Sequence, residues 1–294
     1  MDEPTNRGSF AAQVRNAVAA TGPLCAGIDP SVALLEQWGL DRDAGGLLQF
    51  GLRCVESFAG VVPVVKPQVA FFEQFGSGGM VALEMVIVEA RSAGLLVIAD
   101  AKRGDIGNTM EAYASAWLDP DSTLAVDAVT ALPYLGLGSL DPMIDLAAAH
   151  GRGVIVVVRS SNPEGRSLQK ARTGGGTGPA VEDLLLAAIA ERNHGGRIPE
   201  GTVGAVVGAT LGPSEFDLGG LGGVILAPGL GAQGAGATEV AALFAGCPPG
   251  SVLASASRSL LAAGPERSSL VAAAAQARDE IGAALNAGPG VPVG

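Results

Sequence analysis

The stretch Ile98-Ala99-Asp100-Ala101-Lys102-Arg103-Gly104-Asp105 begins as an apolar run and ends in acidic and basic residues. The run Leu95–Ala101 has the length and apolar character of a strand that is buried on both faces, as strands of parallel sheets are. Because side chains alternate along a strand, Asp100 and Lys102 are expected on the same side. A carboxylate and an ammonium therefore follow a buried strand, and Asp105 follows them after a glycine.

Similar apolar runs recur along the chain and alternate with longer segments of helical character. The other candidate strands are Leu24–Ile28, Val61–Lys66, Ala125–Val129, Gly153–Arg159, Val203–Val207, Gly223–Ala227 and Val252–Ala256. The helical segments are Phe10–Ala20, Ala44–Ala59, Met80–Ser92, Asn108–Leu118, Leu140–Ala149, Ala180–Asn193, Thr238–Ala245 and Glu266–Ala287. This alternation, unbroken in composition, predicts one parallel α/β domain. About eight repeats favour a closed (β/α)8 TIM barrel over an open doubly wound sheet, and no dinucleotide-binding fingerprint follows the first strand.

The composition limits the domain organisation and the partners. We expect the barrel to span residues 1–287 and the Gly/Pro-rich tail 288–294 to be disordered. The formal net charge of −11 argues against a nucleic-acid partner, although a few converging cations can still bind a small anion. The first residues, Met1-Asp2-Glu3-Pro4, do not resemble a signal peptide, and no apolar stretch is long enough to span a membrane. A cytoplasmic protein is the expectation.

Residues suited to disulfide or metal chemistry are few. The three cysteines, Cys25, Cys54 and Cys247, are far apart and are expected to be small buried apolar residues. The two histidines, His150 and His194, lie beside glycines near predicted helix ends and are expected to be exposed. Histidine catalysis and a metal site are therefore not predicted.

Charged residues follow three of the predicted strands. In a parallel barrel the active site lies where the carboxyl ends of the strands meet. The first strand leads to Asp29, the second ends at Lys66, and the third ends with Asp100 and Lys102. Buried charges need partners, and this array offers partners of alternating sign. The alternative for the third strand is a solvated charged turn.

The segment from Asp100 to Thr109, Asp-Ala-Lys-Arg-Gly-Asp-Ile-Gly-Asn-Thr, resembles the orotidine 5′-phosphate decarboxylase signature Asp-x-Lys-x-x-Asp-Ile-x-Asn-Thr. Four more segments resemble the longer bacterial branch, type 2, of that family: Gly27–Pro30, Val65–Gln68, Arg159–Glu164 and Pro228–Gly234. The resemblance thus runs through nearly the whole predicted barrel. Arg103, Gly104 and Gly107 depart from other branches but leave the charged positions untouched.

The resemblance implies decarboxylation of orotidine 5′-phosphate to UMP and CO2 in pyrimidine biosynthesis, without a metal or organic cofactor. It implies that Lys102 stabilises the developing carbanion and protonates the carbon that loses CO2. Asp100 would lie beside the substrate carboxylate and orient Lys102. Lys66 would complete the charged network and contact the ribose, and Asp29 would bind a ribose hydroxyl.

The same resemblance implies a homodimer in which Asp105 and Thr109 enter the neighbouring active site. Ser160 would hydrogen-bond the pyrimidine. The phosphate end of the site would be formed by Pro228, Gly229, Gly231, Gln233 and Arg258. Such glycine-rich turns after the seventh and eighth strands commonly bind phosphate, and an arginine offers a planar fork for it. The alternative for Arg258 is a surface arginine at a helix start.

Other loop residues and other functions stay open. Arg166 and Lys170 could close over a substrate, but a solvated loop is favoured, and Thr173–Gly178 is interpreted as a flexible loop. A metal-assisted aldolase, 3-hexulose-6-phosphate synthase, would explain Asp100, Lys102 and Asp105. It would explain less well the continuation of the signature and the seventh-strand loop. A catalytically silent, nucleotide-binding barrel is the remaining alternative.

Overall fold

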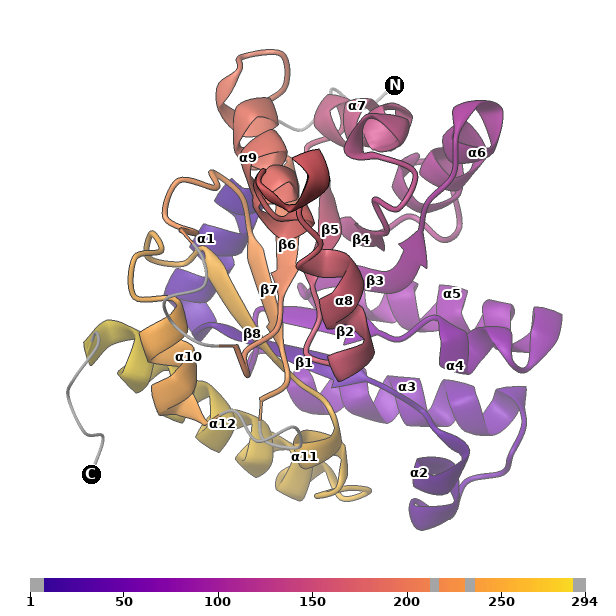
Figure 1. Cartoon of the computed structure of the whole chain (residues 1–294). Coiled ribbons are helices and arrows are strands. Elements are labelled where there is room, and N and C mark those ends of the chain that lie inside the picture. Colours follow the sequence, from indigo (N-terminus) through magenta and orange to yellow (C-terminus); the bar gives the residue numbers. More distant parts are fainter. Residues whose placement is uncertain (1–7, 212–216, 231–235, 288–294) are drawn as a thin grey trace.

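Eight parallel strands close into a barrel in the order β1 to β8, so that β1 pairs with both β2 and β8 (Figure 1). The computed structural model describes residues 8–211, 217–230 and 236–287. The strands are β1 (Leu24–Ile28), β2 (Val64–Pro67), β3 (Leu96–Arg103), β4 (Ala128–Ala131), β5 (Gly153–Arg159), β6 (Val203–Val207), β7 (Ile225–Pro228) and β8 (Val252–Ala256). The predicted single-domain TIM barrel is confirmed as the fold.

Helices surround this barrel on its outer side (Figure 1). They are α1 (Phe10–Thr21), α2 (Val32–Gln37), α3 (Ala44–Phe58), α4 (Ala70–Glu73), α5 (Gly76–Ser92), α6 (Gly107–Leu118), α7 (Asp141–Ala149), α8 (Arg166–Gln169), α9 (Val181–His194), α10 (Ala237–Leu243), α11 (Arg258–Leu261) and α12 (Arg267–Ala287). Short 3-10 turns are η1 (Leu137–Leu140), η2 (Pro163–Gly165) and η3 (Gly174–Gly176). Within the described ranges no helix is long and apolar enough to cross a membrane.

Helix α1 closes the amino-terminal end of the barrel. Its buried residues Phe10 and Val14 join a hydrophobic cluster of inward-facing strand residues that includes Ile98 and Ile155. A Cβ atom at Gly153 would approach the Phe10 ring to 2.4 Å, so glycine at the start of β5 makes room for that ring. With this end filled by apolar side chains, the polar site is left to the carboxyl ends of the strands.

Several predicted boundaries are wrong. The third strand continues past Ala101 to Arg103, and the fourth covers Ala128–Ala131 rather than Ala125–Val129. The reason for the second shift is that Ala125 and Val126 donate their N–H groups to Ser122 and Trp117 carbonyls, outside the barrel ladder. An apolar run does not reveal which of its residues pair with a neighbouring strand.

The first, fifth, sixth and eighth strands have the predicted bounds. The other strand and helix boundaries differ from the predictions by a few residues. The second strand starts at Val64 rather than Val61, and the seventh at Ile225 rather than Gly223. Helix α6 also begins one residue before the predicted Asn108. The helix starts at Gly107, its N-cap is Ile106, and no side chain caps it.

Cysteines and histidines lie largely as predicted. Cys25 and Cys54 are buried, Cys247 is partly buried, and all three are free. Burial raises the pKa of the Cys25 thiol to about 12, so this group stays a protonated apolar residue near neutral pH. Both His150 and His194 are exposed.

Candidate active site

The Asp100 carboxylate lies between two ammonium groups at the carboxyl ends of β2 and β3. Lys66 Nζ is 2.9 Å from Asp100 Oδ2, and Lys102 Nζ is 2.5 Å from Asp100 Oδ1. The Lys66 side chain is only 8% exposed, whereas the Lys102 side chain is 46% exposed. The three residues therefore form one cluster, and Lys102 is its most accessible member.

Two neutral groups complete the hydrogen bonds to Asp100. Gln68 Nε2 donates to Oδ2 at 3.0 Å, and the Thr130 hydroxyl donates to Oδ1 at 2.9 Å. Each carboxylate oxygen thus accepts two hydrogen bonds, one from an ammonium and one from an uncharged donor. This arrangement fixes the orientation of the carboxylate and keeps it ionised.

Electrostatics hold Asp100 and Lys66 in their charged forms. Burial alone would raise the pKa of Asp100, but Lys66 and then Lys102 outweigh it, and the pKa lies well below its usual range. Burial likewise disfavours the charged form of Lys66, but Asp100 and then Asp29 outweigh it and raise the pKa. Both groups therefore stay ionised across the neutral range.

Lys102 has an unusual backbone conformation. Its φ of 47° lies in the left-handed region, and it is the only non-glycine residue with a positive φ among the described residues. The pairing of β3 with β4 is irregular between Ala99 and Arg103, which brackets this residue. Strained backbone of this kind is found preferentially at functional sites. Regular strand alternation therefore explains only part of how Lys102 meets Asp100.

Arg103, next to this lysine, points away from the cluster. Its guanidinium forms an ion pair with Glu73 and lies 5.6 Å from the ring centre of Tyr113 and 5.8 Å from that of Trp117. It also donates from Nη1 to the Ala101 carbonyl at 2.8 Å. Arg103 thereby ties the end of β3 to the helices behind it.

Asp29, which directly follows β1, carries an acceptor oxygen that is unpaired in the described part of the chain and lies beside the cluster. Its Oδ2 accepts a hydrogen bond from the Ser257 hydroxyl, which reaches it from the end of β8. Its Oδ1 is buried and has no hydrogen-bond partner among the described residues. A Cβ atom at Gly27 would lie 2.1 Å from the Ser257 oxygen, so only glycine leaves room for this contact. Asp29 Oδ1 can therefore accept a hydrogen bond from a ligand hydroxyl.

The structure leaves Asp105 and Thr109 outside this cluster. The Asp105 carboxylate accepts the backbone N–H of Ile106 at 2.8 Å, and Thr109 is exposed on α6. Within the described part of the chain, neither side chain hydrogen-bonds to Lys66, Asp100 or Lys102.

The other predicted binding residues follow β5, β7 and β8. Ser160 is half-buried, and its hydroxyl accepts a hydrogen bond from Gln169 Nε2 at 2.9 Å. Arg258 is exposed at the first position of α11. Pro228 ends β7, and Gly229 follows with a φ of 112°, a conformation that favours glycine. The predicted residues Gly231 and Gln233 lie outside the described residues.

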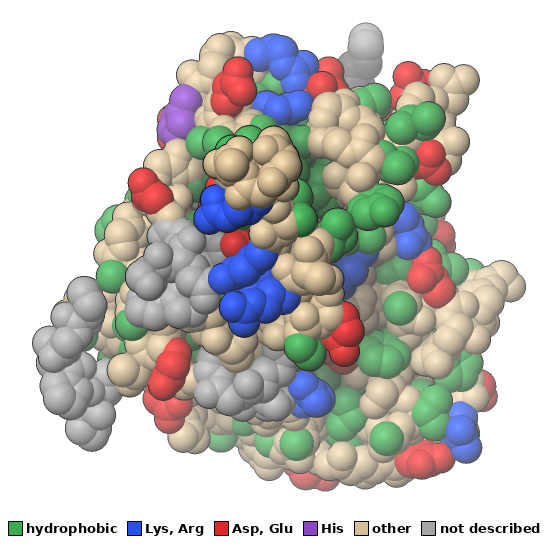
Figure 2. Space-filling view, viewed as in Figure 1, with side chains coloured by type: hydrophobic (Ala, Val, Ile, Leu, Met, Phe, Trp, Pro, Cys, Tyr) green, Lys and Arg blue, Asp and Glu red, His purple; other side chains and the backbone are tan. Residues whose placement is uncertain are grey.

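Positive side chains gather near the middle of the face seen in Figure 2, around α8. Helix α8 itself begins with the exposed Arg166, and Lys170 follows it as a partly buried C-cap residue. The chain as a whole has a formal net charge of −11, so this group of positive side chains is a local feature. It creates a local field that suits an anionic ligand.

Sequence reasoning missed the contributions of Gln68, Thr130 and Ser257. Each is a polar residue at or just past the end of an apolar strand, and that position was the available signal. Thr130 was passed over because the fourth strand was predicted to end at Val129. Ser257 could be read as part of a turn, but its pairing with Asp29 depends on closure of the barrel.

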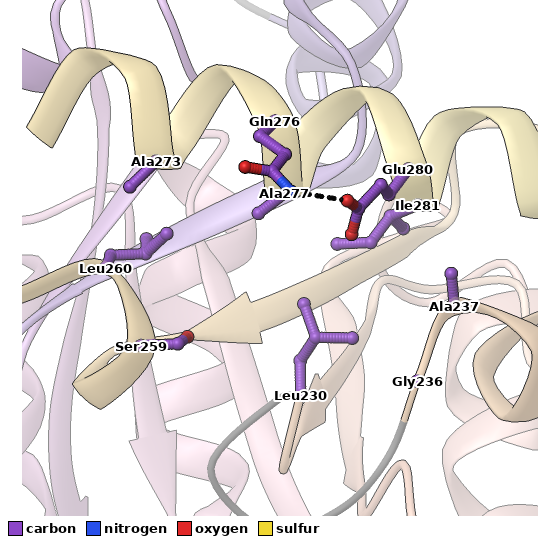
Figure 3. Close-up of a pocket in the computed structure, with 10 residues that line it drawn as sticks. All are labelled: Leu230, Gly236, Ala237, Ser259, Leu260, Ala273, Gln276, Ala277, Glu280 and Ile281. Atoms are coloured by element: carbon purple, nitrogen blue, oxygen red, sulfur yellow. Dashed lines mark hydrogen bonds between the residues drawn. The ribbon is translucent and has the colours of Figure 1, made fainter. Parts of the chain in front are cut away.

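A pocket of about 280 Å³ lies outside the barrel between α10, α11 and α12 (Figure 3). Leu230, Leu260 and Ile281 line it with apolar atoms, and its polar groups Gln276 and Glu280 hydrogen-bond to each other at 2.8 Å. None of the charged cluster reaches it. Among the described residues, His, Cys, Asp and Glu form no group of three or more that could hold a metal ion.

The fold and the cluster define a TIM-barrel enzyme with alternating lysines and aspartates at the carboxyl ends of its strands. Comparison with known proteins then identifies the family. The chain belongs to the orotidine 5′-phosphate decarboxylase / HUMPS family, whose profile matches residues 22–273. This confirms the resemblance found in the sequence.

Relatives and solved structures agree with this assignment. Orotidine 5′-phosphate decarboxylase of Salinispora arenicola is 52% identical over 277 residues, which cover 94% of this chain and 98% of the relative. That of Streptomyces coelicolor is 48% identical, covering 95% and 99% of the two chains. A crystal structure of the protein from Streptomyces avermitilis assigned to this activity has a TM-score of 0.91 and 46% identity, covering 97% of this chain and 99% of that one. The Leishmania donovani OMP decarboxylase has a TM-score of 0.75 and 28% identity, covering 95% and 99%.

Proposed function

We propose that this chain decarboxylates orotidine 5′-phosphate to UMP and CO2 in pyrimidine biosynthesis, with Lys102 as the proton donor. The observation that carries the mechanism is the accessible Lys102 ammonium held 2.5 Å from the buried Asp100 carboxylate. The reaction itself follows from the family and from the relatives that are about half identical.

In the proposed mechanism, the bond between the pyrimidine ring and its carboxylate breaks, and CO2 leaves. The electron pair stays on the ring carbon, where the Lys102 ammonium stabilises it and then donates a proton to it. Asp100 orients that ammonium and disfavours the nearby substrate carboxylate by like-charge repulsion. Lys66 holds the other side of Asp100 and contacts the ribose, and Asp29 Oδ1 accepts a ribose hydroxyl.

We assign the phosphate end of the site to the turns after β7 and β8. Arg258 supplies the guanidinium, and Pro228, Gly229, Gly231 and Gln233 supply the neighbouring contacts. The exposed position of Arg258 at the start of α11, just past the end of β8, supports this role. Ser160 is assigned to the pyrimidine ring because its half-buried hydroxyl lies at the carboxyl end of β5.

The Arg258→Ala variant is expected to raise KM by about tenfold to a hundredfold and to lower kcat, because phosphate binding energy also supports turnover. Steady-state kinetics would measure both. Arg267→Ala is the matched control, since Arg267 is another exposed arginine nearby, paired with the exposed Glu56. Unchanged kinetics in Arg258→Ala would contradict the phosphate assignment.

We also propose a homodimer in which Asp105 and Thr109 act in the partner's site. Exposed apolar side chains support such an interface: Ile106, next to Asp105 in the sequence, is 62% exposed, and Tyr134 and Leu135, which follow β4, are 78% and 54% exposed. Exposed apolar clusters of this kind mark protein–protein contacts.

The shared site can be tested by subunit exchange. Lys102→Ala and Asp105→Ala homodimers are each expected to be nearly inactive, but mixing them should restore about a quarter of the wild-type activity per site, because half of the dimers formed at random contain one intact site. Each protein incubated alone is the control. Mixtures that exchange subunits, as seen by mass spectrometry, yet regain no activity would rule out the shared site.

The overall activity is tested by following the ultraviolet absorbance of orotidine 5′-phosphate mixed with the purified protein in EDTA. Conversion to UMP is the expected result. The profile's family name covers more than one activity, so a Mg²⁺-dependent aldolase assay should be run beside it. Aldolase activity without decarboxylation would favour the synthase, and tight UMP binding without turnover would favour a silent barrel.

The three free cysteines also support the proposal that the enzyme works in the reducing cytoplasm.

A further inference from the structure

We propose that Thr130 is a positioning residue for the decarboxylation, whose hydroxyl holds both the Lys102 backbone and the Asp100 carboxylate in their working geometry. The inference deepens the proposed function and rests on Lys102 being the proton donor. Thr130 lies on β4, whereas the two residues that it binds lie on β3.

The direction of the two hydrogen bonds is set by chemistry. The backbone N–H of Lys102 donates to Thr130 Oγ1 at 3.0 Å, so the hydroxyl oxygen is the acceptor there. The same hydroxyl lies 2.9 Å from Asp100 Oδ1, and an ionised carboxylate can only accept. The hydroxyl's single proton is therefore committed to Asp100. A chain of two bonds runs from the lysine backbone through the threonine to the aspartate, and such chains strengthen each other in a buried setting.

The surroundings of Thr130 indicate that the role of its hydroxyl is to form these two hydrogen bonds. Thr130 is 1% exposed, and its strand neighbours Ala128, Val129 and Ala131 are all apolar and buried. A buried hydroxyl without hydrogen-bond partners is unfavourable. Valine would fill almost the same volume without a buried polar group. Both side-chain hydrogen bonds of Thr130 go to the end of β3 that carries Asp100 and Lys102.

The conformation of Lys102 explains why such a contact is needed. With a φ of 47°, Lys102 is in a region that residues other than glycine seldom adopt. The bonds from Arg103 Nη1 to the Ala101 carbonyl and from the Leu132 N–H to the Arg103 carbonyl fix the residues on either side. Thr130 binds the N–H of Lys102 itself. Without the Thr130 hydroxyl, the Lys102 ammonium would lose its fixed approach to the substrate.

The test compares Thr130→Val, which replaces the hydroxyl with a methyl group, with Thr130→Ser, which keeps the hydroxyl and loses the methyl group. We expect kcat of the valine variant to fall by about tenfold to a hundredfold, as for loss of a hydrogen bond to a charged group, with KM changed by less than about threefold. The serine variant should retain kcat within about threefold of wild type, because the hydroxyl remains.

One further measurement separates positioning from general damage to the fold. Affinity for UMP, measured by calorimetry, should be the same in the valine variant as in wild type, because UMP lacks the carboxylate that reacts. A valine variant with wild-type kcat overturns the inference. So does a serine variant as slow as the valine variant, or a valine variant that loses UMP affinity in proportion to kcat.

Lys102→Ala is measured in parallel so that the inference and the mechanism can fail separately. If Lys102→Ala is inactive and Thr130→Val is fully active, the positioning role is wrong and the proton donor stands. If Lys102→Ala keeps wild-type activity, the proton donor itself is wrong, and the positioning role of Thr130, which rests on it, is overturned as well.

Discussion

Lys102→Ala is expected to lower kcat by at least about 10⁴-fold, because one side chain supplies both proton transfer and stabilisation of the carbanion. The variant should still fold, since the Lys102 side chain is 46% exposed and Asp100 keeps Lys66 as a partner. The measurement is steady-state decarboxylation, with UMP affinity as the check on the site.

Lys102→Arg is the informative control for this prediction. Arginine keeps the positive charge beside Asp100, but its guanidinium does not give up a proton at neutral pH. We therefore expect near-normal stability and almost no turnover. Decarboxylation close to the wild-type rate in either variant would contradict the role of Lys102 as proton donor.

Asp100→Asn is expected to have the second largest effect, on both stability and turnover. The substitution leaves the buried Lys66 ammonium without its counter-charge, and breaking a buried pair from one side destabilises a protein by about 3–5 kcal/mol. Urea denaturation would measure the loss in the free energy of unfolding. Turnover should fall as well, because Lys102 loses the carboxylate that orients it.

Asp145→Asn provides the matched control. Asp145 also pairs with a cation, Arg197 at 2.6 Å, but both side chains are more than half exposed. Exposed pairs contribute about 1 kcal/mol or less, so the control should change stability little. Equal losses in the free energy of unfolding in Asp100→Asn and Asp145→Asn would show that burial of the Lys66–Asp100 pair does not add to its effect on stability.

The stability difference should also depend on pH in a definite direction. The folded-state pKa of Asp100 lies below its unfolded value, so its stabilising contribution is fully present above about pH 4 and is lost as pH falls through the lower folded value. The difference in the free energy of unfolding between wild type and Asp100→Asn should thus be constant from about pH 5 to neutrality. It should become smaller below about pH 4. A stability difference that becomes smaller already near neutral pH would contradict a lowered pKa of Asp100 in the folded state.

Much of the fold could be predicted because its signals are local. Apolar runs and helical periodicity are properties of neighbouring residues, and they gave the order of strands and helices and hence the closed barrel. The charges that end the first three strands, Asp29, Lys66 and Asp100, were visible for the same reason. The ends of β2, β3, β4 and β7 were not predicted exactly, because strand pairing depends on a neighbour that lies far away in the sequence.

The sequence by itself therefore determined the barrel architecture, the presence of alternating charges at the strand ends and the family. Only the tertiary structure decided which groups meet. Thr130 reaches Asp100 across 30 residues of sequence, and Ser257 reaches Asp29 across 228. Those contacts depend on the register of β3 with β4 and on the closure of β8 against β1. The left-handed Lys102 likewise depends on an irregular strand pairing, since no local preference of lysine favours that conformation.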